Sequence, residues 1–210
     1  MARPDLTGIL LVGGASRRFG SPKALALWNG QTLAARAWET LGEACGERLA
    51  VGKRAGGFEL PFPVVDDATA TRAALAGIVA GLRRAETELC VVFPVDMPLV
   101  PPRLLTELAN QLQVTDCYLE ARSADAAVVQ ERPLPAAFFR PSALSVLERR
   151  LAAGELALRD ALAELETRRI DADPALLTNV NTPADLYELE RRTASASSSS
   201  SAPLRARPTK

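Results

Sequence analysis

The 210-residue chain contains no histidine. This absence excludes Ser-His and Cys-His nucleophile pairs, zinc held by histidine, and acid–base catalysis by an imidazole. Cysteine is scarce as well, because Cys45, Cys90 and Cys117 are the whole complement and show no CxxC spacing. Neither a disulfide framework nor a four-cysteine zinc site is therefore expected, and the pattern fits reduced thiols in a cytoplasm.

Neither sign of charge is in excess, since 25 Lys and Arg balance 25 Asp and Glu. Without a basic surplus, binding to a nucleic-acid backbone lacks its usual electrostatic driving force, so no nucleic-acid partner is predicted. Long hydrophobic runs are also missing. The run 6–12 is too short for a signal sequence, and no stretch reaches the roughly 20 residues that cross a membrane. The sequence predicts a soluble, cytoplasmic protein without a membrane partner.

Short apolar runs alternate with helical periodicity through the first half of the chain. The runs that have the length and composition of buried parallel strands are 6–12, 48–51, 62–65 and 89–95. Apolar residues at helical spacing occur in 33–41, 74–82 and 104–112. This alternation predicts an α/β fold with a parallel sheet that is covered on both faces.

The second half is less regular. A strand pair around the turn 131–133, two helices and a short strand are expected, in the ranges 126–130 with 134–140, 144–151, 158–165 and 169–171. A last helix is expected from Thr182-Pro183 to about Arg192, because Thr is a good N-cap, Pro suits the first helical position and Asp185 favours the positive helix end. Residues 193–210 are rich in Ser, Ala and Pro and predict a disordered tail after one domain, 4–192.

A glycine-rich stretch, LLVGGASRRFGSPK (10–23), follows the first predicted strand. The paired glycines Gly13 and Gly14 let the backbone turn sharply and bring N–H groups close to an anion. Cations that include Arg18 and Lys23 follow closely, and such groups bind phosphates. The stretch matches neither a P-loop nor a GxGxxG turn. It indicates either a polyphosphate cradle or an ordinary surface loop with solvated arginines.

Asp96 ends the run VVFPVD. A carboxylate at the carboxyl end of a buried strand lies where open α/β sheets bind ligands, and one Asp that faces phosphates suits Mg²⁺. A turn or helix-capping role is the alternative.

Two asparagines with one residue between them, Asn179 and Asn181, can present their amides on the same side of an extended strand. This arrangement suits a polar heterocycle or a phosphate, while turn chemistry before a helix is the alternative. Asp66 and Asp67 follow an apolar pair and fit either an exposed loop or a ligand site at a strand end.

In combination and order, these segments resemble a known family. LLVGGASRRFGSPKAL resembles the signature loop of the GT-A-like nucleotidyltransferases, and VFPVDMPLVPP and NVNTPADL narrow the likeness to the molybdenum cofactor guanylyltransferases. The resemblance covers residues 6–192. It implies a Rossmann-like, three-layer α/β nucleotidyltransferase domain with a mostly parallel sheet. It also implies the transfer of GMP from GTP to molybdenum-molybdopterin, which forms the guanine dinucleotide cofactor and releases pyrophosphate.

The resemblance assigns roles to the motif residues. Those that would bind the nucleotide are Leu11, Val12, Gly13, Gly14, Lys23, Asp67 and Asp96. The catalytic residues would be Arg18, Lys23 and Asp96. Asp96 would hold the Mg²⁺ cofactor, and Asn179 and Asn181 would face the pterin substrate. Implied protein partners are molybdopterin-carrying biosynthesis proteins or molybdoenzyme chaperones.

Two positions depart from the family pattern. Gly52 stands where relatives commonly carry an Asn that contacts the nucleotide, so a base contact is expected to be missing. Gly52→Asn is accordingly expected to sharpen the preference for GTP over ATP. Arg72-Ala73-Ala74 stands where many relatives carry a Gly-Pro before Leu-Ala-Gly. A molybdopterin cytidylyltransferase or a sugar-phosphate nucleotidyltransferase is the alternative activity. A catalytically silent nucleotide-binding module is a third reading, which Lys23 and Asp96 disfavour because a mere binder need not retain both.

Overall fold

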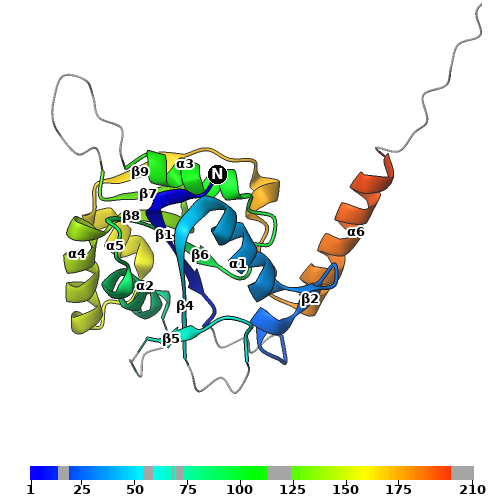
Figure 1. Cartoon of the computed structure of the whole chain (residues 1–210), viewed down its shortest axis with the longest axis horizontal. Helices are drawn as coiled ribbons and strands as arrows, with labels where there is room; N and C mark the ends of the chain where they lie inside the picture. Colours follow the sequence, from blue (N-terminus) through cyan, green and yellow to red (C-terminus); the bar gives the residue numbers. More distant parts are fainter. Residues whose placement is uncertain (14–18, 54–58, 68, 70–72, 113–123, 200–210) are drawn as a thin grey trace, which may run out of the picture.

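A seven-stranded sheet forms the centre of the computed structural model, with strand order β5-β4-β1-β6-β8-β7-β9 (Figure 1). The structure describes the chain except residues 14–18, 54–58, 68, 70–72, 113–123 and 200–210. The strands are β1 (Arg3–Leu11), β4 (Cys45–Gly52), β5 (Val64–Asp66), β6 (Leu89–Pro94), β7 (Ala126–Val129), β8 (Arg132–Phe139) and β9 (Thr167–Ile170). Only β8 runs against its neighbours, so the mostly parallel sheet that was expected is confirmed.

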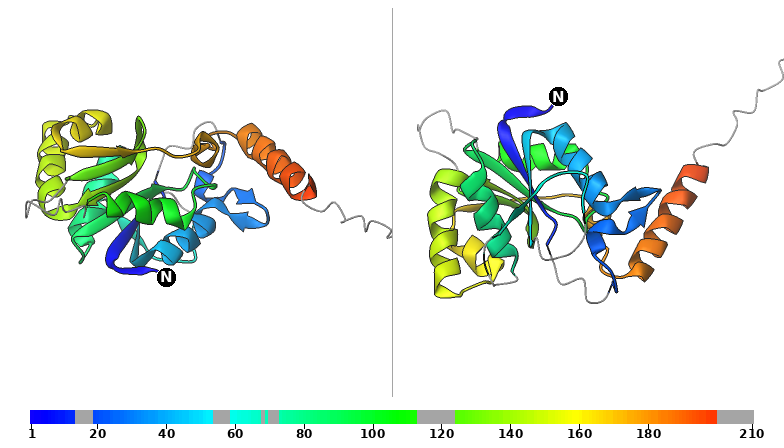
Figure 2. Two further views of the ribbon diagram at one scale, coloured as in Figure 1. Left: turned by 90° about the horizontal axis from the view of Figure 1, so that it is seen from above. Right: turned by 60° about the horizontal axis from the view of Figure 1, so that its bottom comes forward.

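Helices cover both faces of this sheet (Figure 2). On one face lie α1 (Leu33–Ala44) and α3 (Pro102–Asn110), and on the other lie α2 (Ala74–Arg84), α4 (Arg140–Ala153) and α5 (Leu158–Glu164). Successive side chains of β1 alternate between the two cores: Leu10 packs with the first group, Ile9 and Leu11 with the second. The three-layer α/β architecture follows from this two-sided burial.

The chain reverses its direction of winding at β1. From β1 it passes to β4 and then β5 on one side, and it returns to β6 on the other side of β1. Open α/β sheets bind ligands beyond the carboxyl ends of the strands at such a reversal. Leu11 pairs with Pro94 at the last rung, so the glycine-rich stretch and Asp96 leave the sheet from adjacent strand ends.

Two hairpins refine the sequence expectations. β7 and β8 pair as predicted, but the turn is Gln130-Glu131 and β8 already begins at Arg132. A second hairpin, β2 (Leu27–Trp28) with β3 (Gln31–Thr32), was not predicted. Asn29 and Gly30 join its strands with positive φ angles of 50° and 79°, as a tight two-residue turn requires.

Helix α6 (Pro183–Ser199) follows the short 3-10 helix Pro174–Leu177 and leans away from the sheet (Figure 1). The predicted cap is present, since the Thr182 hydroxyl accepts the Asp185 N–H at 3.2 Å. The helix runs on to Ser199 rather than ending near Arg192, and alanines in this stretch favour helix. Part of the expected disordered tail is therefore helical, and residues 200–210 lie outside the described residues.

A small separate core fixes α6 to the β2–β3 hairpin. It consists of Trp28, Leu33, Val180 and Leu189. In the part of the chain that the structure describes, no helix is long and apolar enough to cross a membrane.

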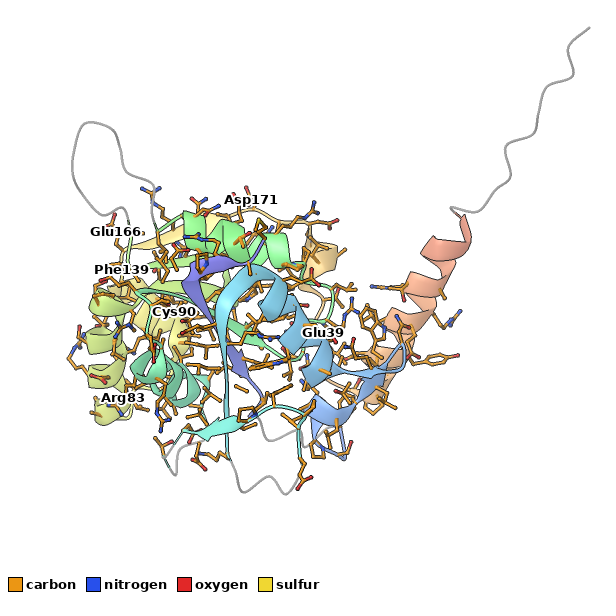
Figure 3. All side chains as sticks on the ribbon, viewed as in Figure 1. Glu39, Arg83, Cys90, Phe139, Glu166 and Asp171 are labelled. Carbon is orange, nitrogen blue, oxygen red and sulfur yellow. The ribbon has the colours of Figure 1, made fainter. Side chains whose placement is uncertain are left out.

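Cys45 and Cys90 are free thiols that are buried in the core (Figure 3 labels Cys90). Burial away from water raises the pKa of each thiol to about 12. Both thiols therefore stay protonated near neutral pH and act as small apolar core groups. Cys117 lies outside the described residues.

Candidate active site

Three predicted site residues meet beyond the ends of β1 and β6. Lys23, the first residue of a short 3-10 helix (Lys23–Leu25), donates to the carboxylate of Asp96 with an Nζ–Oδ2 distance of 3.2 Å. The same ammonium donates to the amide oxygen of Asn181 at 3.0 Å. The Lys23 and Asp96 side chains are 15% and 24% exposed, so a ligand can still reach them. We call Lys23, Asp96 and Asn181 the Lys23 cluster.

Backbone contacts hold the asparagine segment against the end of β6. The N–H of Val180 donates to the carbonyl oxygen of Asp96 at 2.8 Å, and the Val180 side chain is buried. Asp185 accepts the N–H groups of Asn181 and Thr182 at 2.7 and 2.9 Å, which completes a reciprocal cap at the start of α6. Asn181 is therefore fixed on both sides, and its side chain meets Lys23 because of these contacts.

Asn179 carries an unsatisfied polar atom. Its side-chain oxygen is buried and has no hydrogen-bond partner among the described residues. A buried acceptor without a donor is costly, so this oxygen calls for a donor that the chain does not supply, such as a water or a ligand N–H or O–H group.

The donor set at this edge fits one kind of metal. Among the described residues, no group of three or more His, Cys, Asp or Glu side chains gathers to hold an ion. A single carboxylate such as Asp96 fits Mg²⁺, which keeps several waters and takes its other ligands from substrate phosphates. The residues therefore suit a metal that arrives with a polyphosphate rather than a structural ion caged by protein.

A second lysine–carboxylate cluster follows the next two strands. Lys53, just after β4, donates to Oδ1 of Asp67 at 2.6 Å and also to the backbone oxygen of Thr69. The same carboxylate oxygen accepts the N–H and the hydroxyl of Thr69 at 3.2 and 3.4 Å. The Asp67 side chain is only 8% exposed. We call Lys53, Asp67 and Thr69 the Lys53 cluster; the sequence indicated Asp67 but gave no sign of its lysine partner.

Gly52 packs tightly between the two strand ends. A Cβ atom there would lie 2.9 Å from the Val12 side chain and 3.0 Å from the backbone nitrogen of Gly13. Real Cβ atoms avoid such distances, and the N–H of Val12 binds the Val51 oxygen at 3.0 Å, which holds the two strands together. An Asn at position 52 fits only if the Val12 side chain shifts and the Gly13 backbone gives way, which disfavours the expected base contact. Lys53, the next residue, supplies the polar side chain that contacts Asp67.

The remaining predicted residues divide into two groups. Leu11 and Val12 are buried, at 8% and 7% exposure, so their side chains belong to the core and only their backbone can face a nucleotide. Gly13 is exposed at the end of this strand. Gly14 and Arg18 lie outside the described residues.

An open, mostly parallel sheet with a lysine–aspartate pair at its winding reversal is the arrangement of an α/β enzyme that binds its ligand at this edge. Residues 8–170 match the family described as the MobA-like NTP transferase domain. The chain belongs to this family, and the enzyme class expected from the sequence is confirmed.

Named relatives cover nearly the same length. The chain is 36% identical over 195 residues to a probable molybdenum cofactor guanylyltransferase of Chloroflexus aggregans, covering 86% of this chain and 91% of that protein. It is 32% identical to the molybdenum cofactor guanylyltransferase of Methylibium petroleiphilum, covering 88% and 95%.

Solved structures share the fold. Molybdopterin-guanine dinucleotide biosynthesis protein A of Archaeoglobus fulgidus superimposes with a TM-score of 0.75 at 24% identity, covering 90% of this chain and 99% of that one. The 2-C-methyl-D-erythritol 4-phosphate cytidylyltransferase of Thermus thermophilus gives 0.68 at 20% identity, covering 92% and 100%. The second of these is named for a different base and acceptor, so the fold alone leaves substrate choice open.

Proposed function

We propose that this enzyme transfers GMP from GTP to molybdenum-molybdopterin, which yields the molybdopterin guanine dinucleotide cofactor and pyrophosphate. The observation that carries the proposal is the Lys23 cluster, which unites the glycine-rich, aspartate and asparagine segments at one point of the sheet edge. The names of the relatives at 36% and 32% identity favour this acceptor and this base.

The nucleotide lies beyond β1 in this proposal. The backbone from Leu11 to Gly14 wraps it, Lys23 contacts its phosphates, and Asp67 lies near the guanosine. Guanine presents the O6 acceptor beside N–H donors, including its N2 amino group. The Lys53 ammonium, 23% exposed and oriented by Asp67, offers a donor for O6. Adenine carries an amino donor in place of O6, so the lysine would meet a donor at that position.

The chemistry needs no imidazole. An oxygen of the acceptor's terminal phosphate, already anionic near neutral pH, forms a bond to the α-phosphorus of GTP, while the bond from that phosphorus to the bridging oxygen breaks. Pyrophosphate takes the electron pair. No general base is required, so catalysis comes from in-line positioning and from neutralising charge.

The chain's own cations neutralise that charge. Lys23 is held by Asp96 and Asn181, so its ammonium is oriented before substrate arrives. Arg18 stabilises the departing pyrophosphate. Asp96 would hold Mg²⁺, which when bound supplies further stabilisation of the negative phosphate oxygens.

The acceptor lies on the asparagine side. Asn181 faces the cluster, and the buried oxygen of Asn179 accepts a hydrogen bond from a pterin N–H donor. Molybdopterin-carrying biosynthesis proteins or molybdoenzyme chaperones are the partners that would deliver the acceptor or receive the product, in the cytoplasm.

A nucleotide-transfer assay tests the proposal. The protein is incubated with Mg²⁺, molybdenum-molybdopterin and GTP, CTP or ATP labelled at the α-phosphate, and labelled dinucleotide and pyrophosphate are measured. We expect labelled product chiefly from GTP. Product chiefly from CTP would assign a cytidylyltransferase, and transfer only when a sugar phosphate replaces molybdopterin would assign a sugar-phosphate nucleotidyltransferase. Nucleotide binding without pyrophosphate release under every condition would leave a silent binding module.

A further inference from the structure

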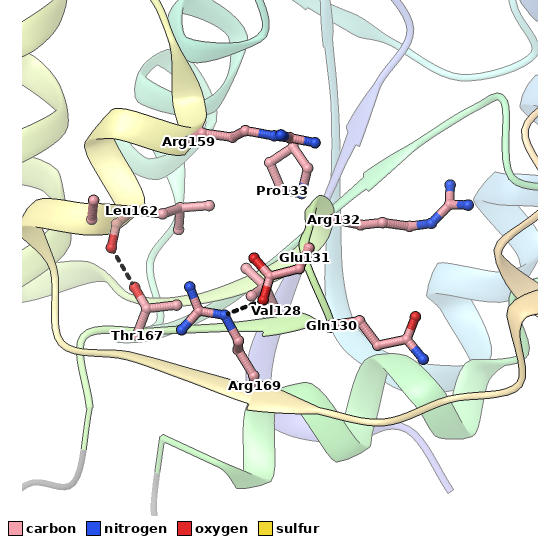
Figure 4. Close-up of a pocket in the computed structure, with 10 residues that line it drawn as sticks. Val128, Gln130, Glu131, Arg132, Pro133, Arg159, Leu162, Thr167 and Arg169 are labelled. Atoms are coloured by element: carbon pink, nitrogen blue, oxygen red, sulfur yellow. Dashed lines mark hydrogen bonds and ion pairs between the residues drawn. The ribbon is translucent and has the colours of Figure 1, made fainter.

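The arginines of the pocket between α5 and the β7–β8 hairpin do not converge on one point (Figure 4). Arg132 is directed away from Arg159, and Arg169 approaches Glu131 at 3.4 Å. Arg36 is placed differently. It lies on α1, a helix that packs on β1 and also contacts the β2–β3 hairpin, and it contacts two of the segments that carry the Lys23 cluster.

The Arg36 side chain holds the segment that follows Asp96. Its Nε donates to the carbonyl oxygen of Pro98 at 2.8 Å, and this bond is partly buried. Pro98 is in a turn that the N–H of Val100 closes onto the carbonyl oxygen of Met97 at 3.3 Å. Replacement of Arg36 removes the donor from a partly buried carbonyl, which is costly. Arg36 therefore restrains the backbone just beyond the Asp96 carboxylate.

The same guanidinium also lies against the segment that follows Lys23. Its Cζ is 4.2 Å from the centroid of the Trp28 ring, within the range of a cation–π contact. Trp28 ends the short strand β2 and is only 3% exposed. Burial lowers the pKa of the Arg36 guanidinium while the nearby Glu39 raises it, and an arginine stays a cation in proteins. A cation–π contact is strongest where water is partly excluded in this way.

Trp28 extends this contact to the third segment of the cluster. It shares the small core with Val180, whose N–H donates to the carbonyl oxygen of Asp96 at 2.8 Å. Asn181 follows Val180 directly and accepts from the Lys23 ammonium. One guanidinium thus contacts the aspartate segment and, directly or through Trp28, the lysine and asparagine segments.

We propose that Arg36 is a positioning residue: held between Pro98 and Trp28, it keeps Asp96 beside Lys23 in the place where the carboxylate can serve a nucleotide-bound Mg²⁺. Arg36 acts through the backbone after Asp96 and through the Trp28 ring. Its effect on transfer rests on the proposed function, whereas its effect on the binding of GTP with Mg²⁺ does not require an acceptor.

Arg48 offers a matched control. Its Cζ lies 4.6 Å from the centroid of the Trp38 ring, and its Nη1 donates to the Trp38 carbonyl oxygen at 2.9 Å. Both arginines therefore make one aromatic contact and one bond to a backbone oxygen, but the Arg48 contacts join β4 to α1. The chain has two tryptophans, so their indole N–H signals in nitrogen-15-labelled protein report the two contacts separately.

GTP titrations with and without Mg²⁺ test the proposal in the absence of transfer. We expect Mg²⁺ to tighten GTP binding to the wild type. Arg36→Met should reduce this tightening about tenfold, as expected for one lost charge-assisted hydrogen bond, while GTP alone binds as before. Arg36→Gln, the second variant, should behave in the same way, and Arg48→Met should keep the full effect of Mg²⁺.

The indole signals verify each variant, because Arg36→Met should shift the Trp28 signal and Arg48→Met the Trp38 signal. Equal Mg²⁺ effects in Arg36→Met and Arg48→Met would overturn the proposal, as would a wild type whose affinity for GTP does not respond to Mg²⁺.

Steady-state kinetics then measures the consequence for the reaction. With Mg²⁺ present, Arg36→Met should raise the KM for GTP about tenfold, in step with the change in binding, and Arg48→Met should leave it unchanged. A KM equal to that of the wild type in Arg36→Met would contradict the positioning role. A wild type that shows the Mg²⁺ effect on GTP binding but transfers no GMP to molybdopterin would refute the proposed function and leave the positioning role standing.

Discussion

The Lys23 and Lys53 clusters lie beyond strands of the same sheet, and the groups around each pair set them apart. Lys23 meets Asp96 at 3.2 Å and shares its ammonium with Asn181, whereas Lys53 meets Asp67 at 2.6 Å. The carboxylate is 24% exposed in the first pair and 8% in the second. The carboxylate of the first pair is open to a ligand, while the neighbours of the second close around its carboxylate and leave the Lys53 ammonium, 23% exposed against 15% for Lys23, as its accessible group.

This difference teaches that a lysine–aspartate pair does not define an active site by itself. Its function depends on which strand ends the pair connects and on whether a ligand can still reach it. Lys23 joins the strand ends at the winding reversal, where ligands bind. Lys53 joins the ends of β4 and β5, one step further out, and is suited to holding a loop or reading a base.

The largest expected effect is at the open pair. Asp96→Ala should abolish transfer and leave the fold intact, because the metal's stabilisation of phosphate charge, several kcal/mol, is lost. Single-turnover rates with Mg²⁺, GTP and acceptor measure the effect, and a thermal melt checks folding. Asp171→Ala, an exposed residue after β9, is the matched control. Turnover near the wild-type rate would show that Asp96 holds no catalytic metal.

Arg18→Ala should come next, with a loss of about 100-fold in kcat and a smaller change in KM. Charge grows on pyrophosphate as the bond breaks, so a cation there stabilises the transition state more than the bound substrate. Separate measurement of kcat and KM checks this. An effect confined to KM would mean that Arg18 binds the ground state and transition state equally.

Gly52→Asn changes the residue next to Lys53, at the end of β4. The new side chain collides with Val12 and Gly13, so we expect a stability loss of about 1–3 kcal/mol and a raised KM for GTP. Denaturant unfolding and GTP titration measure these quantities. Gly154→Asn, at a helix end with open space around it, is the control. A tighter GTP site in Gly52→Asn would restore the view that position 52 reads the base.

Lys53→Met tests the closed pair. Loss of the ammonium should lower the preference for GTP over ATP about tenfold, because a charged hydrogen bond to O6 is removed. Competition between the two nucleotides measures the ratio of kcat/KM values. An unchanged ratio would limit Lys53 to tethering the loops after β4 and β5.

The smallest effect is expected at the chain end. Removal of residues 200–210 should change neither the melting temperature nor activity, because Leu204 is the one large apolar residue in this segment that could offset the entropy of ordering. A fall of several degrees in Tm would show that the segment packs on the domain.

Local patterns predicted much of the fold and the place of Asp96 at a strand end. The apolar runs located β1, β4 and β6, and Asp96 was expected at a strand end because its sequence signal is local. The contact between Lys23 and Asn181 joins residues 158 positions apart, which no local pattern can indicate. The family resemblance assigned a role to Lys23 and another to Asn181, but it did not indicate that their side chains touch.

Tertiary packing explains what the sequence could not show. Gly52 was interpreted as a missing side chain, but a Cβ atom there would press on Val12 and Gly13, and Lys53 is the polar group beside Asp67. The β2–β3 hairpin escaped prediction because two-residue strands are too short for an alternating pattern, although Asn29-Gly30 is a strong turn signal.

The central claim is that Lys23 acts in the transfer step whereas Lys53 acts in base recognition, and one rate tests it most directly. Single-turnover GMP transfer is measured at saturating GTP for the wild type, Lys23→Ala and Lys53→Met. We predict that Lys23→Ala slows transfer about 100-fold even when GTP is saturating, because oriented charge at the reacting phosphates is lost. Lys53→Met should keep a rate close to the wild type. Equal losses in the two variants, or a larger loss in Lys53→Met, would contradict this assignment.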